Sequence, residues 1–123
     1  MARQILMGGT DDGVNGSLST SATQRIPFWG YGEVKGTSDE HAVPAPCNLT
    51  VRSLRVDLLT APGEGSSRTF TVKVDGVATD LTVTIEDEET TATLTGVDVV
   101  VTAGQTIALE ATAADSPDAS RVL

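Results

Sequence analysis

The amino-acid sequence predicts a single all-β domain, an antiparallel sandwich or barrel without helices. Short segments alternate apolar and polar residues with the two-residue period of a strand. Turn signals such as Asp75-Gly76 and Ala103-Gly104 separate these segments at short, fairly regular spacing. A chain of 123 residues has the usual size of one domain. We therefore expect one core enclosed by seven or eight short strands.

The first segment, residues 1–24, is rich in Gly, Ser, Thr, Asp and Asn. Ile5, Leu6 and Met7 are its only evident apolar anchors. Two interpretations stay open: an extended N-terminal arm that is ordered by contact with something else, or a floppy tail.

The next segment, residues 25–34, holds most of the aromatic side chains of the protein. Pro27 restricts this segment to an edge strand or to the start of a strand. Phe28, Trp29 and Tyr31 either meet a subunit or partner, as amphipathic aromatic residues often do, or cap the core of their own chain.

The segments that follow alternate between strands and loops. Residues 41–46 contain two prolines, so a short extended piece outside any central strand is expected there. One long strand is expected over residues 49–58, with a bulge near Arg52-Ser53, because the apolar residues change parity at that point. Residues 61–66 have the composition of a loop.

A hairpin is the strongest local prediction. Phe70, Val72 and Val74 alternate with polar residues and are followed by the turn pair Asp75-Gly76. A second alternating run then begins and carries apolar residues at Leu81, Val83 and Ile85. The acidic residues 86–89 break the pattern and are expected to form a solvated turn.

The rest of the chain predicts further strands. Two are expected at residues 91–95 and 97–102, with Gly96 between them, and another at residues 107–112. After a loop at residues 114–118, residues 119–123 are expected to close a sheet.

The charge balance argues against two classes of partner. Seventeen acidic residues against eight basic ones give a formal net charge of −9, and no stretch concentrates Lys or Arg. We therefore expect no nucleic-acid partner and no anionic membrane partner. The first seven residues lack the apolar core of a secretory signal, which predicts synthesis in the cytoplasm.

The sequence contains few residues that could form a catalytic or metal-binding site. His41 and Cys47 are the single histidine and cysteine, and we expect a surface histidine and a small buried cysteine. Asp11, Gly13 and Asn15 echo a calcium loop only weakly, because a glycine occupies the second ligand position and no bidentate Glu follows at the right spacing. We expect no catalytic residue, no cofactor and no metal site, and hence not an enzyme.

Somewhat more than half of the chain resembles a known kind of protein. The residues that carry the resemblance are Leu54-Arg55-Val56-Asp57-Leu58, Pro62-Gly63, residues 68–85 and the "strand, Ala-Gly, strand" element at residues 99–109. With them, the span from Leu54 to Val122 resembles a recurrent type of tailed-phage structural protein, in which a strand ends before a Pro-Gly loop and a Thr-rich strand then turns into a second strand. The resemblance implies a jelly roll of the tumour-necrosis-factor and C1q kind over residues 25–123, preceded by the arm. It also implies trimers on a virion surface.

The function expected from the resemblance is that of a capsid decoration protein, which binds the major capsid protein and stabilises the viral shell. The alternative is a receptor- or glycan-binding module of a virion fibre or a cell surface. The residues expected at the interface come from the arm and the aromatic segment: Ile5, Leu6, Ile26, Phe28, Trp29 and Tyr31.

Overall fold

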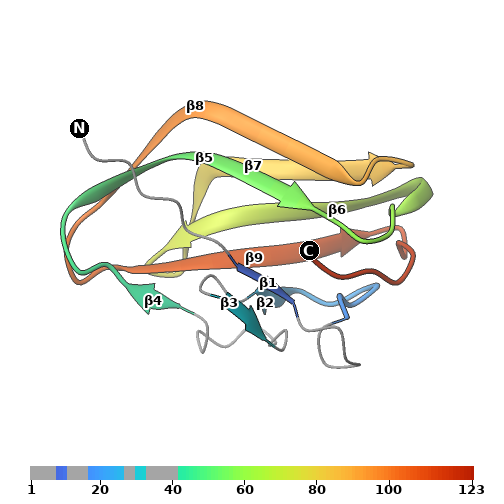
Figure 1. Cartoon of the computed structure of the whole chain (residues 1–123), viewed down its shortest axis with the longest axis horizontal. Helices are drawn as coiled ribbons and strands as arrows, with labels where there is room; N and C mark the ends of the chain where they lie inside the picture. The colour runs from blue at the N-terminus through green and yellow to red at the C-terminus, as the bar shows by residue number, and fades with distance from the viewer. Residues whose placement is uncertain (1–7, 11–16, 27–29, 33–41) are drawn as a thin grey trace.

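The structure is a computed structural model that describes residues 8–10, 17–26, 30–32 and 42–123. Over these residues it contains nine strands and no helix, and two antiparallel sheets pack as a β-sandwich (Figure 1). The predicted all-β sandwich is confirmed. The strands are β1 (Gly8–Thr10), β2 (Gln24–Ile26), β3 (Gly30–Gly32), β4 (Val43–Pro44), β5 (Leu49–Asp57), β6 (Gly63–Val74), β7 (Val77–Asp87), β8 (Thr91–Val101) and β9 (Thr106–Ala114). No helix of the described chain is long and apolar enough to cross a membrane.

The larger sheet, called the main sheet below, has the strand order β2-β9-β6-β7, and β4 also pairs with β9. All of its pairings are antiparallel. Strand β9 lies inside this sheet, and its residues Ile107, Ala108 and Leu109 are buried in succession. Such a run is expected where both faces of a strand are covered.

The second layer, called the small sheet, consists of β5 paired with β8. The C-terminal residues extend it, because Leu58 forms a β-bridge with Val122 and the backbone N–H of Leu123 donates to the carbonyl of Asp57. The N–H of Leu18 in turn donates to the carbonyl of Ser120 at 2.8 Å. Segments from both ends of the chain therefore lie beside the small sheet.

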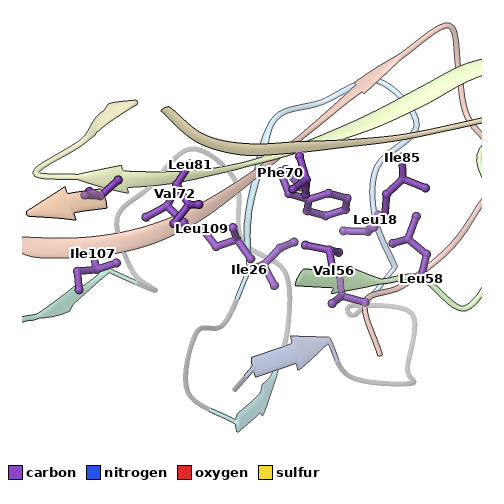
Figure 2. Packing of buried hydrophobic residues seen from close by; sticks show 14 of the residues in the cluster. Leu18, Ile26, Val56, Leu58, Phe70, Val72, Leu81, Ile85, Ile107 and Leu109 are labelled. Atoms are coloured by element: carbon purple, nitrogen blue, oxygen red, sulfur yellow. The ribbon is translucent and has the colours of Figure 1, made fainter. Parts of the chain in front are cut away.

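The core lies between the two sheets and, among the described residues, consists mainly of branched aliphatic side chains together with the ring of Phe70 (Figure 2). The alternation expected for β6 and β7 places Phe70, Leu81 and Ile85 in this core with no exposed surface. Leu18 also belongs to the core at 3% exposure. The segment before residue 25 therefore has an anchor that its composition did not reveal.

Two local predictions are confirmed. Strands β6 and β7 are joined by a two-residue turn in which Asp75 and Gly76 both have positive φ, at 49° and 76°, the geometry that favours Asp-Gly in a tight hairpin. The register of β5 against β8 shifts between Val51 and Ser53, where the parity change predicted a bulge.

Three predictions are wrong in detail. Residues 91–102 do not form two strands, because β8 runs through Gly96, which adopts a φ of +80° at the register shift. A glycine can either end a strand or form a β-bulge within it, and Gly96 forms a bulge within β8. Strand β6 already begins at Gly63, so the loop expected over residues 61–66 is shorter. Residues 119–123 contribute a single β-bridge instead of a strand.

The bulge at Gly96 leads to a prediction. No atom lies within 4 Å of the position that a Cβ would take, so replacement by alanine would cost only backbone strain. Gly96→Ala is expected to lower the free energy of unfolding by about 1 kcal/mol in chemical denaturation. The exposed neighbour change Thr95→Ala should stay within about 0.5 kcal/mol of the parent. If Gly96→Ala left the free energy of unfolding unchanged, that result would contradict the positive φ of Gly96.

Candidate interaction surface

The arm and the aromatic segment meet in the structure. Strand β1 of the arm pairs in parallel with β3 of the aromatic segment, with Gly8 opposite Gly30 and Gly9 opposite Tyr31. The intervening strand β2 pairs with β9 at the border of the main sheet. Figure 1 shows β1, β2 and β3 gathered on this side of the sandwich. Two segments that were predicted separately to make contacts therefore lie on one side of the molecule.

The predicted interface residues divide into three groups. Ile26 is fully buried in the core, so its side chain offers no surface to a partner, and assigning it to the interface is corrected. It is buried because β2 pairs with the covered strand β9, which places Ile26 opposite Leu109. Tyr31 lies in β3. Ile5, Leu6, Phe28 and Trp29 lie outside the described residues.

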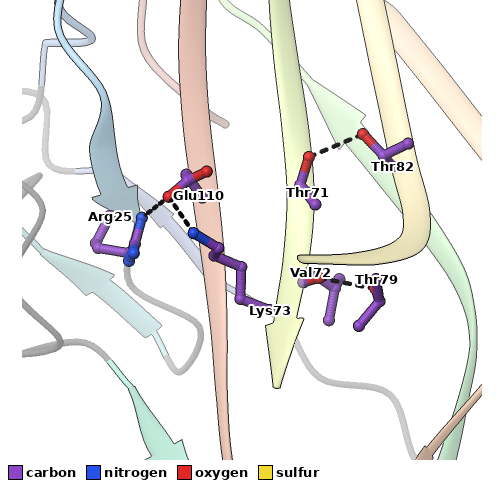
Figure 3. Close-up of polar contacts among 7 residues, drawn as sticks. All are labelled: Arg25, Thr71, Val72, Lys73, Thr79, Thr82 and Glu110. Atoms are coloured by element: carbon purple, nitrogen blue, oxygen red, sulfur yellow. Dashed lines mark hydrogen bonds and ion pairs between the residues drawn. The ribbon is translucent and has the colours of Figure 1, made fainter. Parts of the chain in front are cut away.

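A charged cluster lies on the outer face of the main sheet, next to β2. Arg25 stands opposite Glu110 in the register of β2 and β9, and its guanidinium donates to Glu110 Oε2. Lys73 on the neighbouring strand β6 places its Nζ 2.9 Å from the same oxygen (Figure 3). Arg25 is 5% exposed. One carboxylate thus holds two cations from two different strands.

The surroundings of Glu110 act on its pKa in opposite directions. Burial favours the neutral acid and would raise the pKa, whereas hydrogen bonds from Lys73 and Arg25 and their positive charges favour the carboxylate. The favourable interactions outweigh burial, so the pKa of Glu110 lies below its ordinary value. Glu110 therefore remains ionised at neutral pH.

A threonine ladder continues this outer face across β6 and β7. Thr69 and Thr84 lie opposite each other with their hydroxyls 3.0 Å apart. Thr71 and Thr82 repeat this contact at 2.9 Å, as Figure 3 shows. Thr79 donates to the carbonyl of Val72 at 2.7 Å, where β7 has an irregular register. The alternation of threonine with apolar residues in both strands is the sequence signal for this polar face.

Arg68 is the principal residue that sequence reasoning missed. It lies on β6 in phase with Phe70 and Val72, so its side chain points into the sandwich, and it is 2% exposed. Its guanidinium donates to the carbonyl of Ser19 at 2.7 Å and to that of Asp118 at 2.9 Å. Burial lowers its pKa. Arg68 thereby ties segments near both ends of the chain to the main sheet. A basic residue at an inward strand position was the available signal.

No group of three or more His, Cys, Asp or Glu side chains among the described residues is placed to hold a metal ion. Cys47 is exposed, so the expectation of a buried cysteine is wrong; it follows Pro46 at the surface, before β5 begins. His41 and the weak calcium-loop residues Asp11, Gly13 and Asn15 lie outside the described residues.

Comparison with protein-family models, curated proteins and solved structures found no match.

Proposed function

We propose that the chain is a structural protein of a virion that binds the outer surface of the shell and stabilises it. In this proposal the sandwich is a jelly roll that assembles as a trimer, and its partner is the major capsid protein. The observation that carries the proposal is the pairing of β1 with β3, which places the arm and the aromatic segment on one side of the sandwich. That side is the anchoring side.

In the proposed mechanism, the protein stabilises the shell mechanically. Each subunit contributes one anchoring side, and a trimer presents three of them in a fixed arrangement. Once one anchoring side is bound, the others bind at a high effective concentration, so weak individual contacts give a long-lived attachment. Neighbouring capsid subunits held by one trimer are tied together. The protein is made in the host cytoplasm and functions on the virion.

The way the arm is attached to the core is consistent with the proposed binding of the shell by the arm. Leu18 is buried and is hydrogen-bonded to Ser120, so the chain is fastened to the sandwich downstream of β1. The chain before Leu18 is therefore proposed to make the contact with the shell, while Leu18 itself stays in the core. A deletion that stops at residue 10 spares Leu18.

The experiment is co-sedimentation with empty shells of the major capsid protein from the same genome. The full chain is expected to bind saturably, and the chain without residues 1–10 to bind at least about tenfold more weakly, because each subunit of the trimer loses its anchor. Equal thermal unfolding of the two proteins would show that the deletion left the sandwich intact. Failure of the full chain to sediment with shells would overturn the proposal, and equal binding of both proteins would overturn the role of the arm.

A further inference from the structure

The turn between β6 and β7 contains a residue pair that is prone to a spontaneous change of the backbone. Asp75 and Gly76 form this turn, and both are exposed. In an Asp-Gly pair the glycine nitrogen can attack the aspartate side chain, because glycine has no Cβ to hinder the approach. Among the described residues, none beyond the chain neighbours of Gly76 has an atom within 4 Å of the position that its Cβ would take. The surroundings of the turn therefore leave room for the reaction.

The carboxylate of Asp75 is held by the segment that begins β9. The backbone N–H of Thr106 donates to Asp75 Oδ1 at 2.8 Å, and Nε2 of Gln105 donates to Oδ2 at 3.1 Å. The backbone N–H of Asp75 in turn donates to the carbonyl of Thr106 at 2.9 Å. Figure 1 shows that β6 ends and β9 begins at the same end of the sandwich, where Val74 lies opposite Ile107. Both carboxylate oxygens are thus engaged with a segment 30 and 31 residues away.

The side chain of Gln105 is itself held in place. Its Oε1 accepts a hydrogen bond from the backbone N–H of Thr102 at 2.8 Å. Its backbone carbonyl accepts one from the N–H of Ala45, also at 2.8 Å. The amide is therefore already oriented when it donates to Asp75, and the contact costs little further side-chain entropy.

These contacts oppose the attack of Gly76 on Asp75 in two ways. Ring closure requires Cγ of Asp75 to turn toward the nitrogen of Gly76, and this rotation breaks the hydrogen bonds to Thr106 and Gln105. The reacting form is the protonated acid, because a neutral carboxyl group loses water more readily than a carboxylate does. The hydrogen bonds from Thr106 and Gln105 lower the pKa of Asp75, so the acid is rarer at neutral pH in the folded chain than in the unfolded one.

We propose that Asp75 is a site of spontaneous isoaspartate formation and that Thr106 and Gln105 suppress the reaction in the folded chain. In the first step, the nitrogen of Gly76 bonds to Cγ of Asp75, and a carboxyl oxygen leaves as water with the proton of that nitrogen. In the second step, water adds to the main-chain carbonyl carbon of Asp75, and the bond from this carbon to the nitrogen of Gly76 breaks. The nitrogen regains a proton, and the former main-chain carbonyl becomes a free carboxylate. The composition of the chain is unchanged, but its backbone now runs through Cγ and is longer by one carbon atom.

The product does not fit the turn that the structure contains. The two-residue hairpin depends on the positive φ of Asp75 and Gly76, and a longer backbone cannot keep that geometry. The new carboxylate is attached at Cα and no longer reaches Thr106 and Gln105 from the side-chain position. The reaction is therefore expected to detach the hairpin from the beginning of β9.

The experiment incubates the purified full chain at neutral pH in water enriched in heavy oxygen, once folded and once in denaturant. Isoaspartate at position 75 is quantified by peptide mapping with electron-transfer fragmentation, and uptake of the heavy oxygen reports ring opening by water. The folded chain is expected to react at least about tenfold more slowly than the denatured chain, the effect of two hydrogen bonds of ordinary strength.

Two variants test the role of Gln105 in the folded chain. Gln105→Ala removes the donor to Asp75 and is expected to accelerate isoaspartate formation about fivefold, the effect of one hydrogen bond. Gln105→Glu keeps an acceptor for Thr102 but places a second negative charge beside Asp75, so it should accelerate the reaction at least as much. Thermal unfolding checks that both variants remain folded.

The chain offers two matched controls. Asn48→Ala also removes an amide side chain that is hydrogen-bonded to a backbone segment, the N–H of Ala103, but it leaves the contacts of Asp75 in place. Its rate at Asp75 should equal that of the unaltered chain. The sequence contains a second Asp-Gly pair, Asp12-Gly13, whose rate should not respond to the substitutions at Gln105.

Three results would overturn the inference. Equal rates at Asp75 in the folded and denatured chain would show that the fold gives no protection, and no isoaspartate in denaturant would remove the site. If the folded Gln105 variants reacted no faster than Asn48→Ala, the contact from Gln105 would not be what suppresses the reaction.

Discussion

Replacing Arg68 by alanine is expected to lower the free energy of unfolding by about 3–5 kcal/mol, because the change removes a large buried side chain and two hydrogen bonds together. The carbonyls of Ser19 and Asp118 would lose a charged donor inside the sandwich. Backbone hydrogen bonds such as that from Leu18 to the carbonyl of Ser120 and that from Asp118 to the carbonyl of Pro62 would remain. Chemical denaturation measures the loss, and hydrogen exchange should show faster opening near both ends of the chain.

Two further variants separate the causes of this loss. Arg68→Met fills part of the space without the guanidinium, so it should recover part of the stability while the two carbonyls remain without their donor. Arg52→Ala removes an arginine from an exposed ion pair and should change stability by less than about 0.5 kcal/mol. If Arg68→Ala lowered the free energy of unfolding as little as Arg52→Ala, Arg68 would not be what holds the two terminal segments to the main sheet.

The substitution Glu110→Gln is expected to lower stability by about 2–4 kcal/mol at pH 7. The amide keeps the size of the side chain but removes the negative charge that Arg25 and Lys73 share. Removing one partner of a buried ion pair is strongly destabilising because a desolvated charge is left behind. Glu64→Gln, at an exposed position, is the matched control and should change little.

The effect of Glu110→Gln should depend on pH. The pKa of Glu110 is lowered in the folded protein, so the carboxylate stabilises the fold above the pKa of an unfolded glutamate, about 4.3. That stabilisation is lost as the pH falls through the lowered folded-state pKa. The difference between Glu110→Gln and its parent should therefore shrink in denaturation experiments below about pH 4. A difference that stays constant down to about pH 2 would show that the ion pairs are not its source.

The structural features that could be predicted from the sequence are those set by residues adjacent along the chain. The Asp75-Gly76 hairpin and the bulge near Arg52 follow from turn chemistry and from parity, and both are present. Gly96 was misread because glycine permits both a turn and a bulge, and only the pairing partner decides between them.

Contacts between distant residues could not be predicted. Arg25 and Glu110 are 85 residues apart, and Arg68 finds its acceptors 49 and 50 residues away. No periodicity within a single strand indicates which residues will lie opposite each other across a sheet. The interface roles of Ile5, Leu6, Phe28 and Trp29 stay predictions, whereas Ile26 shows how a residue in an expected contact segment can belong to the core.

The irregular registers of β7 and β8 bear on aggregation. Each is an 11-residue strand, and no described strand pairs with its outer edge. Long, flat edges are templates for fibril growth. Here β7 is interrupted opposite Val72 and β8 is interrupted at Gly96, so an incoming strand could stay in register only over short stretches. The interrupted registers therefore disfavour amyloid-like pairing between the backbone edges of neighbouring copies.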